Sequence, residues 1–204
     1  MAAAKNKNTA VFFQALVIAT VAEFAGLFFW VNQADKGNFF FGIVIVLAGL
    51  LAERISVYML IHTVWGPNPP HKNLVLNLVV AGIGETIAWL LWLYLADGPL
   101  GLLWASVLLG VVLLFEHSIQ IGFFMQINFF KHVTDPMTIV FSALEGVVAF
   151  FWLYFVRNDH IILGMIVLLV GLTVEHIIQG SVIGTEPPKA HKAKHKPRRN
   201  TPLP

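Results

Sequence analysis

Residues 110–126 read GVVLLFEHSIQIGFFMQ, and residues 171–184 read GLTVEHIIQGSVIG. Each stretch places a Glu-His pair, and a Gln four residues after the Glu, inside a run of mainly apolar side chains. Ionisable side chains are costly in a segment long enough to cross a bilayer, and where they occur they mark functional sites. The two stretches therefore predict membrane-spanning helices that carry a polar site.

The composition of the whole chain indicates a polytopic membrane protein. Of 204 residues, 57% are hydrophobic and 12% are charged, whereas about a quarter are charged in soluble domains. A spanning helix needs about 20 mainly apolar residues. Six stretches meet this requirement: 10–31, 39–64, 74–96, 101–128, 137–156 and 161–184. We therefore predict an all-α integral membrane protein with six transmembrane helices.

An internal repeat of about 60 residues becomes visible when the glutamates are aligned. The first helix of each repeat carries a Glu and, seven residues later, a Trp: Glu23 and Trp30, Glu85 and Trp92, Glu145 and Trp152. The second helix carries a Glu followed directly by a cationic or imidazole side chain: Glu53 and Arg54, Glu116 and His117, Glu175 and His176. We predict three tandem pseudo-equivalent hairpins, at residues 1–65, 66–128 and 129–184.

The distribution of basic residues predicts that both termini are cytoplasmic. With the N-terminus inside, ten Lys and Arg residues fall in cytoplasmic segments, whereas only Lys36 and Arg157 fall outside. The positive-inside rule favours this orientation. Turns at 32–38, 97–101 and 157–160 would then be external, and the Pro-containing links 66–73 and 128–136 internal. In the second link we expect Asp135 to cap the next helix and Pro136 to open it.

Residues 185–204 form a basic, Pro-rich cytoplasmic tail. Such a segment is typical of a disordered arm that contacts anionic lipid head groups at the membrane surface. Binding of a partner protein is the alternative. The chain carries no nucleic-acid motif, so nucleic acid is not an expected partner.

Six glutamates fall within about two helical turns of the bilayer midplane, counting 1.5 Å per residue. Carboxylates at that depth repel one another, and the loss of water disfavours their charged form. The spanning segments offer at most three compensating positive charges, from Arg54 and from His117 and His176 if both are protonated. We therefore expect bound protons or bound cations to supply the rest.

If the hairpins close into a ring, one Glu from each helix can face the ring axis. Gln120 and Gln179 would share the faces of Glu116 and Glu175, one turn nearer the cytoplasm. The adjacent His lies about 100° further around its helix, so we expect it to meet a neighbouring helix. The three repeated Trp side chains are predicted to be anchors in the membrane interface; on the Glu face they would instead form a layer across the axis.

The candidate metal ligands come from the last two repeats: Glu85, Glu116, His117, Glu145, Glu175 and His176. Four carboxylates and two imidazoles match the ligand count of di-iron and di-manganese bundle sites, although the Glu-x-x-His spacing of those sites is absent. Either a dinuclear or a mononuclear centre of Fe, Mn, Zn or Cu is expected. Supporting roles are predicted for Glu23, Glu53, Gln120, Gln179 and Arg54, with Arg54 acting as an internal counter-ion that neutralises the first repeat.

Two other functions fit the same cluster. Midplane acids beside His are typical of proton relays and of coupled cation transporters. Alternatively, the polar contacts join helices in a non-catalytic subunit of a larger membrane complex, at about 0.6 kcal/mol per contact. The chain has no cysteine, which excludes disulfides and thiolate chemistry. No nucleophile elbow or phosphate loop is present, so an enzyme of this sequence would be a metal-centre oxidoreductase.

Overall fold

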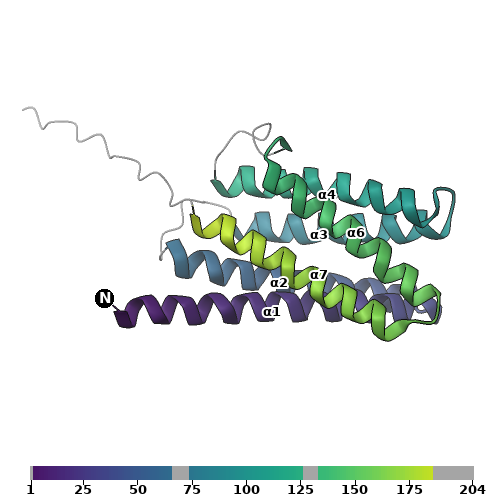
Figure 1. Cartoon of the computed structure of the whole chain (residues 1–204), viewed down its shortest axis with the longest axis horizontal. Coiled ribbons are helices and arrows are strands. Elements are labelled where there is room, and N and C mark those ends of the chain that lie inside the picture. The colour runs from purple at the N-terminus through teal and green to yellow at the C-terminus, as the bar shows by residue number, and fades with distance from the viewer. Residues whose placement is uncertain (1, 66–73, 126–132, 186–204) are drawn as a thin grey trace, which may run out of the picture.

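The computed structural model describes residues 2–65, 74–125 and 133–185 (Figure 1). These residues are all-helical and contain six long helices: α1 (Ala2–Asp35), α2 (Phe39–Trp65), α3 (Leu74–Asp97), α4 (Gly101–Met125), α6 (Pro136–Arg157) and α7 (Ile161–Thr185). Each helix is long and apolar enough to cross a membrane. The prediction of a polytopic, all-α membrane protein is thereby confirmed. The predicted link 66–73, most of the link 128–136 and nearly all of the basic tail lie outside the described residues.

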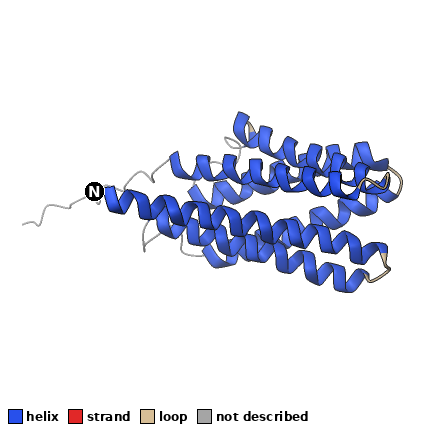
Figure 2. Ribbon diagram, turned by 60° about the horizontal axis from the view of Figure 1, so that its bottom comes forward, coloured by secondary structure: helices blue, strands red, loops and turns tan. Residues whose placement is uncertain are grey.

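The six helices form a closed ring that follows their order in the chain. Each helix packs on the next, from α1 through α2, α3, α4 and α6 to α7, and α7 returns to α1. The turns that join α1 to α2, α3 to α4 and α6 to α7 lie together at one end of the bundle, opposite the N-terminus (Figures 1 and 2). We call this end the hairpin end. The ring encloses one interior that all six helices face.

Capping and turn residues set helix boundaries at the positions that the sequence predicts. The Asp135 carboxylate accepts a hydrogen bond from the Thr138 backbone N–H at 3.0 Å, and Pro136 begins α6. This confirms the predicted cap. In the turn between α1 and α2, Gly37 has a φ of 77°, a conformation that glycine adopts without steric penalty.

Glycines allow helix pairs to approach closely, as is common between membrane helices. A Cβ atom on Gly49 of α2 would lie 2.7 Å from the Cα atom of Gly26 in α1. A Cβ atom on Gly146 of α6 would lie 2.7 Å from the Ser106 carbonyl oxygen of α4. Neither contact leaves room for a side chain, so these helix pairs depend on glycine.

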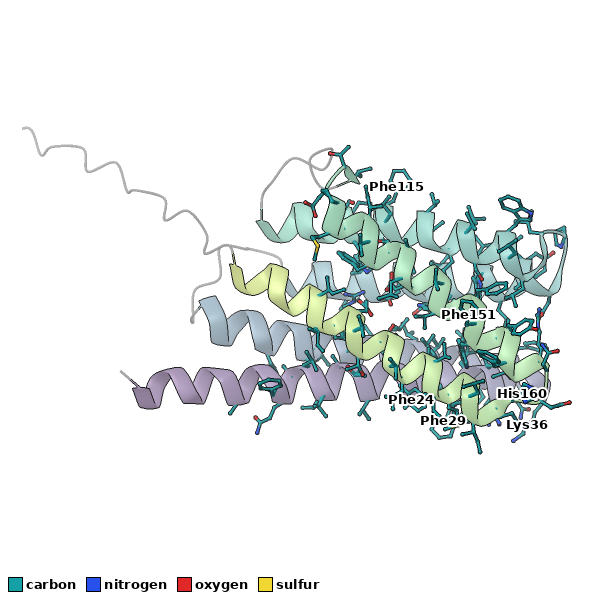
Figure 3. The ribbon with its side chains drawn as sticks, in the orientation of Figure 1. Phe24, Phe29, Lys36, Phe115, Phe151 and His160 are labelled. Atoms are coloured by element: carbon teal, nitrogen blue, oxygen red, sulfur yellow. The ribbon has the colours of Figure 1, made fainter. Side chains whose placement is uncertain are left out.

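The exterior of the bundle is apolar. Only 33% to 44% of the residues in each spanning window are buried, and many of the others are large apolar side chains that point outward. Phe29 and Phe115, which are about half exposed, lie at the periphery in Figure 3, and Lys36 and His160 lie at the hairpin end. The surface between the ends therefore suits contact with the hydrocarbon of a bilayer.

Four tryptophans fill the interior on the hairpin-end side. Trp30, Trp89, Trp92 and Trp152 are each at most 2% exposed. The rings of Trp92 and Trp152 stack with their centroids 5.9 Å apart, and Trp89 meets both edge-on. The prediction that the repeated tryptophans anchor in the membrane interface is wrong. Because they share a helix face with the glutamates, the ring turns them inward, whereas Trp104 is 64% exposed.

Candidate metal centre

The six glutamates lie at one level inside the ring. Glu23 is 12 residues from the hairpin end of α1, and Glu116 is 15 residues from that end of α4; the other four fall between these limits. At a rise of 1.5 Å per residue, this is about 18–22 Å along the helix. Five of the glutamates are at most 3% exposed, and the Glu116 side chain is 12% exposed. The regular spacing of the glutamates in the sequence sets this common depth.

Arg54 joins carboxylates from three helices. Its Nε atom lies 3.0 Å from Glu53 Oε2 on the same helix. Its Nη2 atom donates a hydrogen bond to Glu85 Oε2 of α3 and lies 3.9 Å from Glu116 Oε1 of α4. Since a guanidinium is always charged, these three carboxylates have a permanent counter-ion.

His176 of α7 reaches across to α1. Its Nε2 atom lies 3.5 Å from Glu23 Oε2 and 3.8 Å from Glu53 Oε1. Its Nδ1 atom is within hydrogen-bonding distance of Thr20 Oγ1, at 3.1 Å. The hydroxyl group thereby fixes the orientation of the ring, which presents its other nitrogen to the carboxylates.

His117 of α4 also meets a hydroxyl group and a Glu of the next helix, α6, but it meets both with the same ring nitrogen. Its Nδ1 atom lies 3.2 Å from Ser142 Oγ and 3.7 Å from Glu145 Oε2. Its Nε2 atom lies 3.7 Å from Glu116 Oε2. The expectation that each His meets a neighbouring helix is confirmed for both histidines.

One rule describes all three basic side chains. The residue after the Glu of α2, α4 and α7 contacts the Glu of the next helix around the ring: Arg54 meets Glu85, His117 meets Glu145, and His176 meets Glu23. Each contacted Glu is preceded, three positions earlier, by a residue that faces the same basic side chain. This residue is Thr20 beside His176 and Ser142 beside His117, whereas the corresponding position before Glu85 is Gly82. A Cβ atom on Gly82 would lie 3.2 Å from Leu51 Cδ2 and 3.8 Å from Arg54 Cγ, so position 82 faces the helix that carries Arg54.

Two groups of side chains have the geometry of a metal site. In the first, one ligand atom each from Glu23, Glu175 and His176 all lie within 4.8 Å of one another. In the second, the same holds for His117, Glu145 and Glu175. Every member is at most 5% exposed. Carboxylate oxygens and imidazole nitrogens are the ligands that Fe, Mn and Zn take in proteins.

Several polar atoms at this level make no hydrogen bond to the described residues. They include Glu23 Oε1, Glu145 Oε2 and His117 Nε2. Buried polar atoms normally have a hydrogen-bond partner, and those without one call for an explanation such as a bound ion. These atoms belong to members of the two groups, so both groups have unused capacity to bind a ligand.

The predicted ligands all belong to the last two repeats, but the ligand groups in the structure also include a residue of the first repeat. His117, Glu145, Glu175 and His176 are brought together as predicted candidates. Glu85 and Glu116 lie instead beside Arg54, whereas Glu23, predicted to have a supporting role, joins a ligand group. Arg54 acts as a counter-ion, but two of its partners, Glu85 and Glu116, belong to the second repeat. The side chains of Gln120 and Gln179 lie outside the described part of the chain.

Sequence reasoning missed the two hydroxyl groups. Thr20 and Ser142 each lie three residues before the Glu of their helix, at the same position in the repeat. Aligning polar residues around the glutamates would have found them. Their contact with His could not have been found in this way, because it joins helices as far apart in sequence as Thr20 and His176.

Comparisons with protein-family models, with curated proteins and with solved structures gave no match to this chain.

Proposed function

We propose that this protein binds divalent metal ions in a Glu/His cluster held within the bilayer by three pseudo-equivalent helical hairpins. The observation that carries the proposal is the charge at the common level. Six carboxylates and the Arg54 guanidinium leave an excess of five negative charges when both histidines are neutral, and three when both are protonated. An excess of this size is very costly away from water unless positive charge joins it.

The kind and orientation of the side chains favour a metal over protons alone. Each ligand group combines an imidazole with two carboxylates, a mixture typical of Fe, Mn and Zn sites. One nitrogen of each His faces a hydroxyl oxygen. Metal-binding histidines commonly donate their second N–H to a carboxylate, carbonyl or water oxygen, which fixes the tautomer and the ring orientation, and a hydroxyl oxygen can accept in the same way.

The packing towards the hairpin end favours binding over conduction. Apolar side chains that are at most 2% exposed fill the interior one and two turns closer to that end than the glutamates of α2, α4 and α7: Val46, Leu50, Leu109, Leu113, Leu168 and Leu172. The tryptophan layer also lies on this side. An ion crossing these layers would have to lose its water without finding polar replacements.

Burial supports the hairpin repeat at 1–65, 66–128 and 129–184. Residues 79–92 of α3 and 139–152 of α6 have the same order of buried, intermediate and exposed positions. The excess of basic residues on the side opposite the hairpin end supports two cytoplasmic termini. Because the chain has no cysteine, single cysteines at Lys36 and Lys194 can test this topology with an impermeant thiol reagent. Labelling of both from the same side of the membrane would contradict it.

Elemental analysis of the purified protein tests the proposed function. We expect a stoichiometric transition metal in the wild type, and its loss from the double variant Glu23→Gln/Glu145→Gln, which removes one carboxylate from each ligand group. Asp97→Asn, at the exposed hairpin end, should keep its metal. A metal-free wild type that gives pH-dependent currents in liposomes would replace the proposal with a proton pathway. A metal-free, inactive protein that co-purifies in a larger complex would favour a structural subunit.

A further inference from the structure

Glu175 is a member of both ligand groups. It joins Glu23 and His176 on one side, and His117 and Glu145 on the other. The carboxylate is 2% exposed and has two oxygens, so it can offer one to each neighbouring position. Carboxylates shared in this way are the defining ligands of dinuclear sites in helical bundles.

We infer that the cluster holds two divalent cations bridged by the Glu175 carboxylate, and that Arg54 takes the third basic position of the ring in place of a third cation. This inference rests on the proposed metal-binding function and adds to it the number of ions and the ligands of each. The first ion is bound by Glu23, Glu175 and His176. The second is bound by His117, Glu145 and Glu175.

The distances within each group suit an ion with little rearrangement. In tetrahedral geometry, metal–ligand bonds of about 2.0–2.2 Å place two ligand atoms about 3.3–3.6 Å apart. The ligand atoms of each group lie within 4.8 Å of one another, so no pair has to approach by more than about 1.5 Å to close around an ion. Rotamer adjustments of long Glu side chains can supply such movements without moving a helix.

The adjacent Glu-His pair explains why the familiar spacing of dinuclear bundles is absent. In a four-helix bundle both ligands of a helix face one axis, which requires Glu-x-x-His. In this six-helix ring, Glu175 and His176 point about 100° apart. His176 therefore reaches α1 while Glu175 remains available to the group that contains residues from α4 and α6.

Each proposed position contains an unsatisfied buried oxygen from a residue other than the bridge. Glu23 Oε1 in the first group and Glu145 Oε2 in the second make no hydrogen bond to the described residues. Two divalent ions would also reduce the excess of five negative charges to one, which a single bound proton removes. One ion would leave three. The charge and the unsatisfied atoms thus favour two ions.

Arg54 explains why two ions are expected in a ring with three related positions. Its guanidinium contacts Glu53, Glu85 and Glu116. These three carboxylates are therefore neutralised in part by a charge that belongs to the chain. The third position has Arg54 where the other two have a histidine, and a cation there would be repelled by the guanidinium.

Manganese binding by the purified full-length protein tests the inference. The protein is stripped with a chelator and loaded with Mn²⁺, and bound metal is counted by elemental analysis and examined by electron paramagnetic resonance. We expect two Mn²⁺ per chain with an exchange-coupled spectrum. Glu23→Gln and Glu145→Gln should each bind one Mn²⁺ with an uncoupled six-line spectrum. The matched control Glu85→Gln, beside Arg54, should keep two.

The possible outcomes separate this inference from the proposed function. One Mn²⁺ per wild-type chain, or two with no coupling, would overturn the bridged pair and leave metal binding intact. No bound Mn²⁺, with no other metal in the protein as isolated, would overturn both. Loss of metal from Glu85→Gln would overturn the division of the ring between Arg54 and the ions. Circular dichroism and gel filtration check that each variant folds. If a variant does not fold, the electron paramagnetic resonance spectrum of the Mn²⁺-loaded wild type still decides whether the two ions are bridged.

Discussion

The region around Arg54 and the two regions around His117 and His176 are built on one plan but differ in the charge that they contain. Arg54 brings a permanent positive charge to three carboxylates. Each His meets carboxylates of two helices, and it carries a charge only when protonated. One third of the ring thus carries a permanent positive charge, whereas in the other two thirds we propose that bound cations supply it. A single basic residue in each repeat decides between these states.

The largest effect in this comparison is expected from removing the permanent charge. Arg54→Met leaves Glu53, Glu85 and Glu116 buried without their guanidinium. Breaking a buried ion pair by removing one partner typically costs about 3–5 kcal/mol, so we expect a loss of unfolding free energy of that order, measured by denaturant titration in detergent micelles.

Arg157→Met is the matched control for this substitution. Arg157 pairs with Asp97 at the hairpin end, where both side chains are exposed to 36% or more, and exposed pairs contribute at most about 1 kcal/mol. Equal losses from the two substitutions would show that the Arg54 region does not depend on its internal charge.

A gain of metal should follow when the Arg54 region is made to resemble the other two. Arg54→His combined with Gly82→Ser supplies the imidazole and the hydroxyl found in the other regions. We expect the new imidazole, with Glu85 and Glu116, to bind a third Mn²⁺, which elemental analysis would count. We also expect this variant to lose stability when the metal is removed, because the permanent positive charge within the glutamate cluster is gone.

Arg54→His with Gly84→Ser provides the control, since a Cβ atom on Gly84 meets nothing within 4 Å. Its third Mn²⁺ should bind more weakly than in the Gly82→Ser variant. A folded Arg54→His/Gly82→Ser protein that still binds only two ions would show that the three regions are not equivalent.

A smaller effect is expected from the hydroxyl groups that orient the histidines. Thr20→Val and Ser142→Ala should each weaken Mn²⁺ binding at one position, because loss of a group that orients a metal ligand typically costs about 10–100-fold in affinity. A titration of Mn²⁺ into the metal-free protein measures the change.

Thr86→Val is the control for the hydroxyl substitutions. Thr86 is buried near the same level, but its hydroxyl donates to the Gly82 carbonyl oxygen of its own helix at 2.7 Å. The Thr86→Val protein should bind Mn²⁺ with the same affinity as the wild type. A comparable loss in all three variants would mean that the hydroxyl groups act on packing and not on the histidines.

The sequence was sufficient to predict the elements and the depth of the site. A helix that crosses hydrocarbon must satisfy its backbone internally and present apolar side chains, so composition within a window of about 20 residues identifies a span. The rise per residue then gives the level of Glu23 or Glu175 by counting alone. Asp135 and Pro136 also predicted the start of α6 correctly, because a helix cap depends only on residues next to it in the sequence.

Which side chains meet across the ring was decided by the tertiary structure. The sequence places Trp30 and Glu23 on one helix face but does not say whether that face meets lipid or the interior. Closure of the ring by α7 against α1 turns it inward and brings His176 to Glu23 and Thr20, 153 and 156 residues away along the chain. Contacts between helices depend on the rotation and order of whole helices, which no local pattern encodes. Depth was therefore a property of the sequence, and the partners of each carboxylate were a property of the fold.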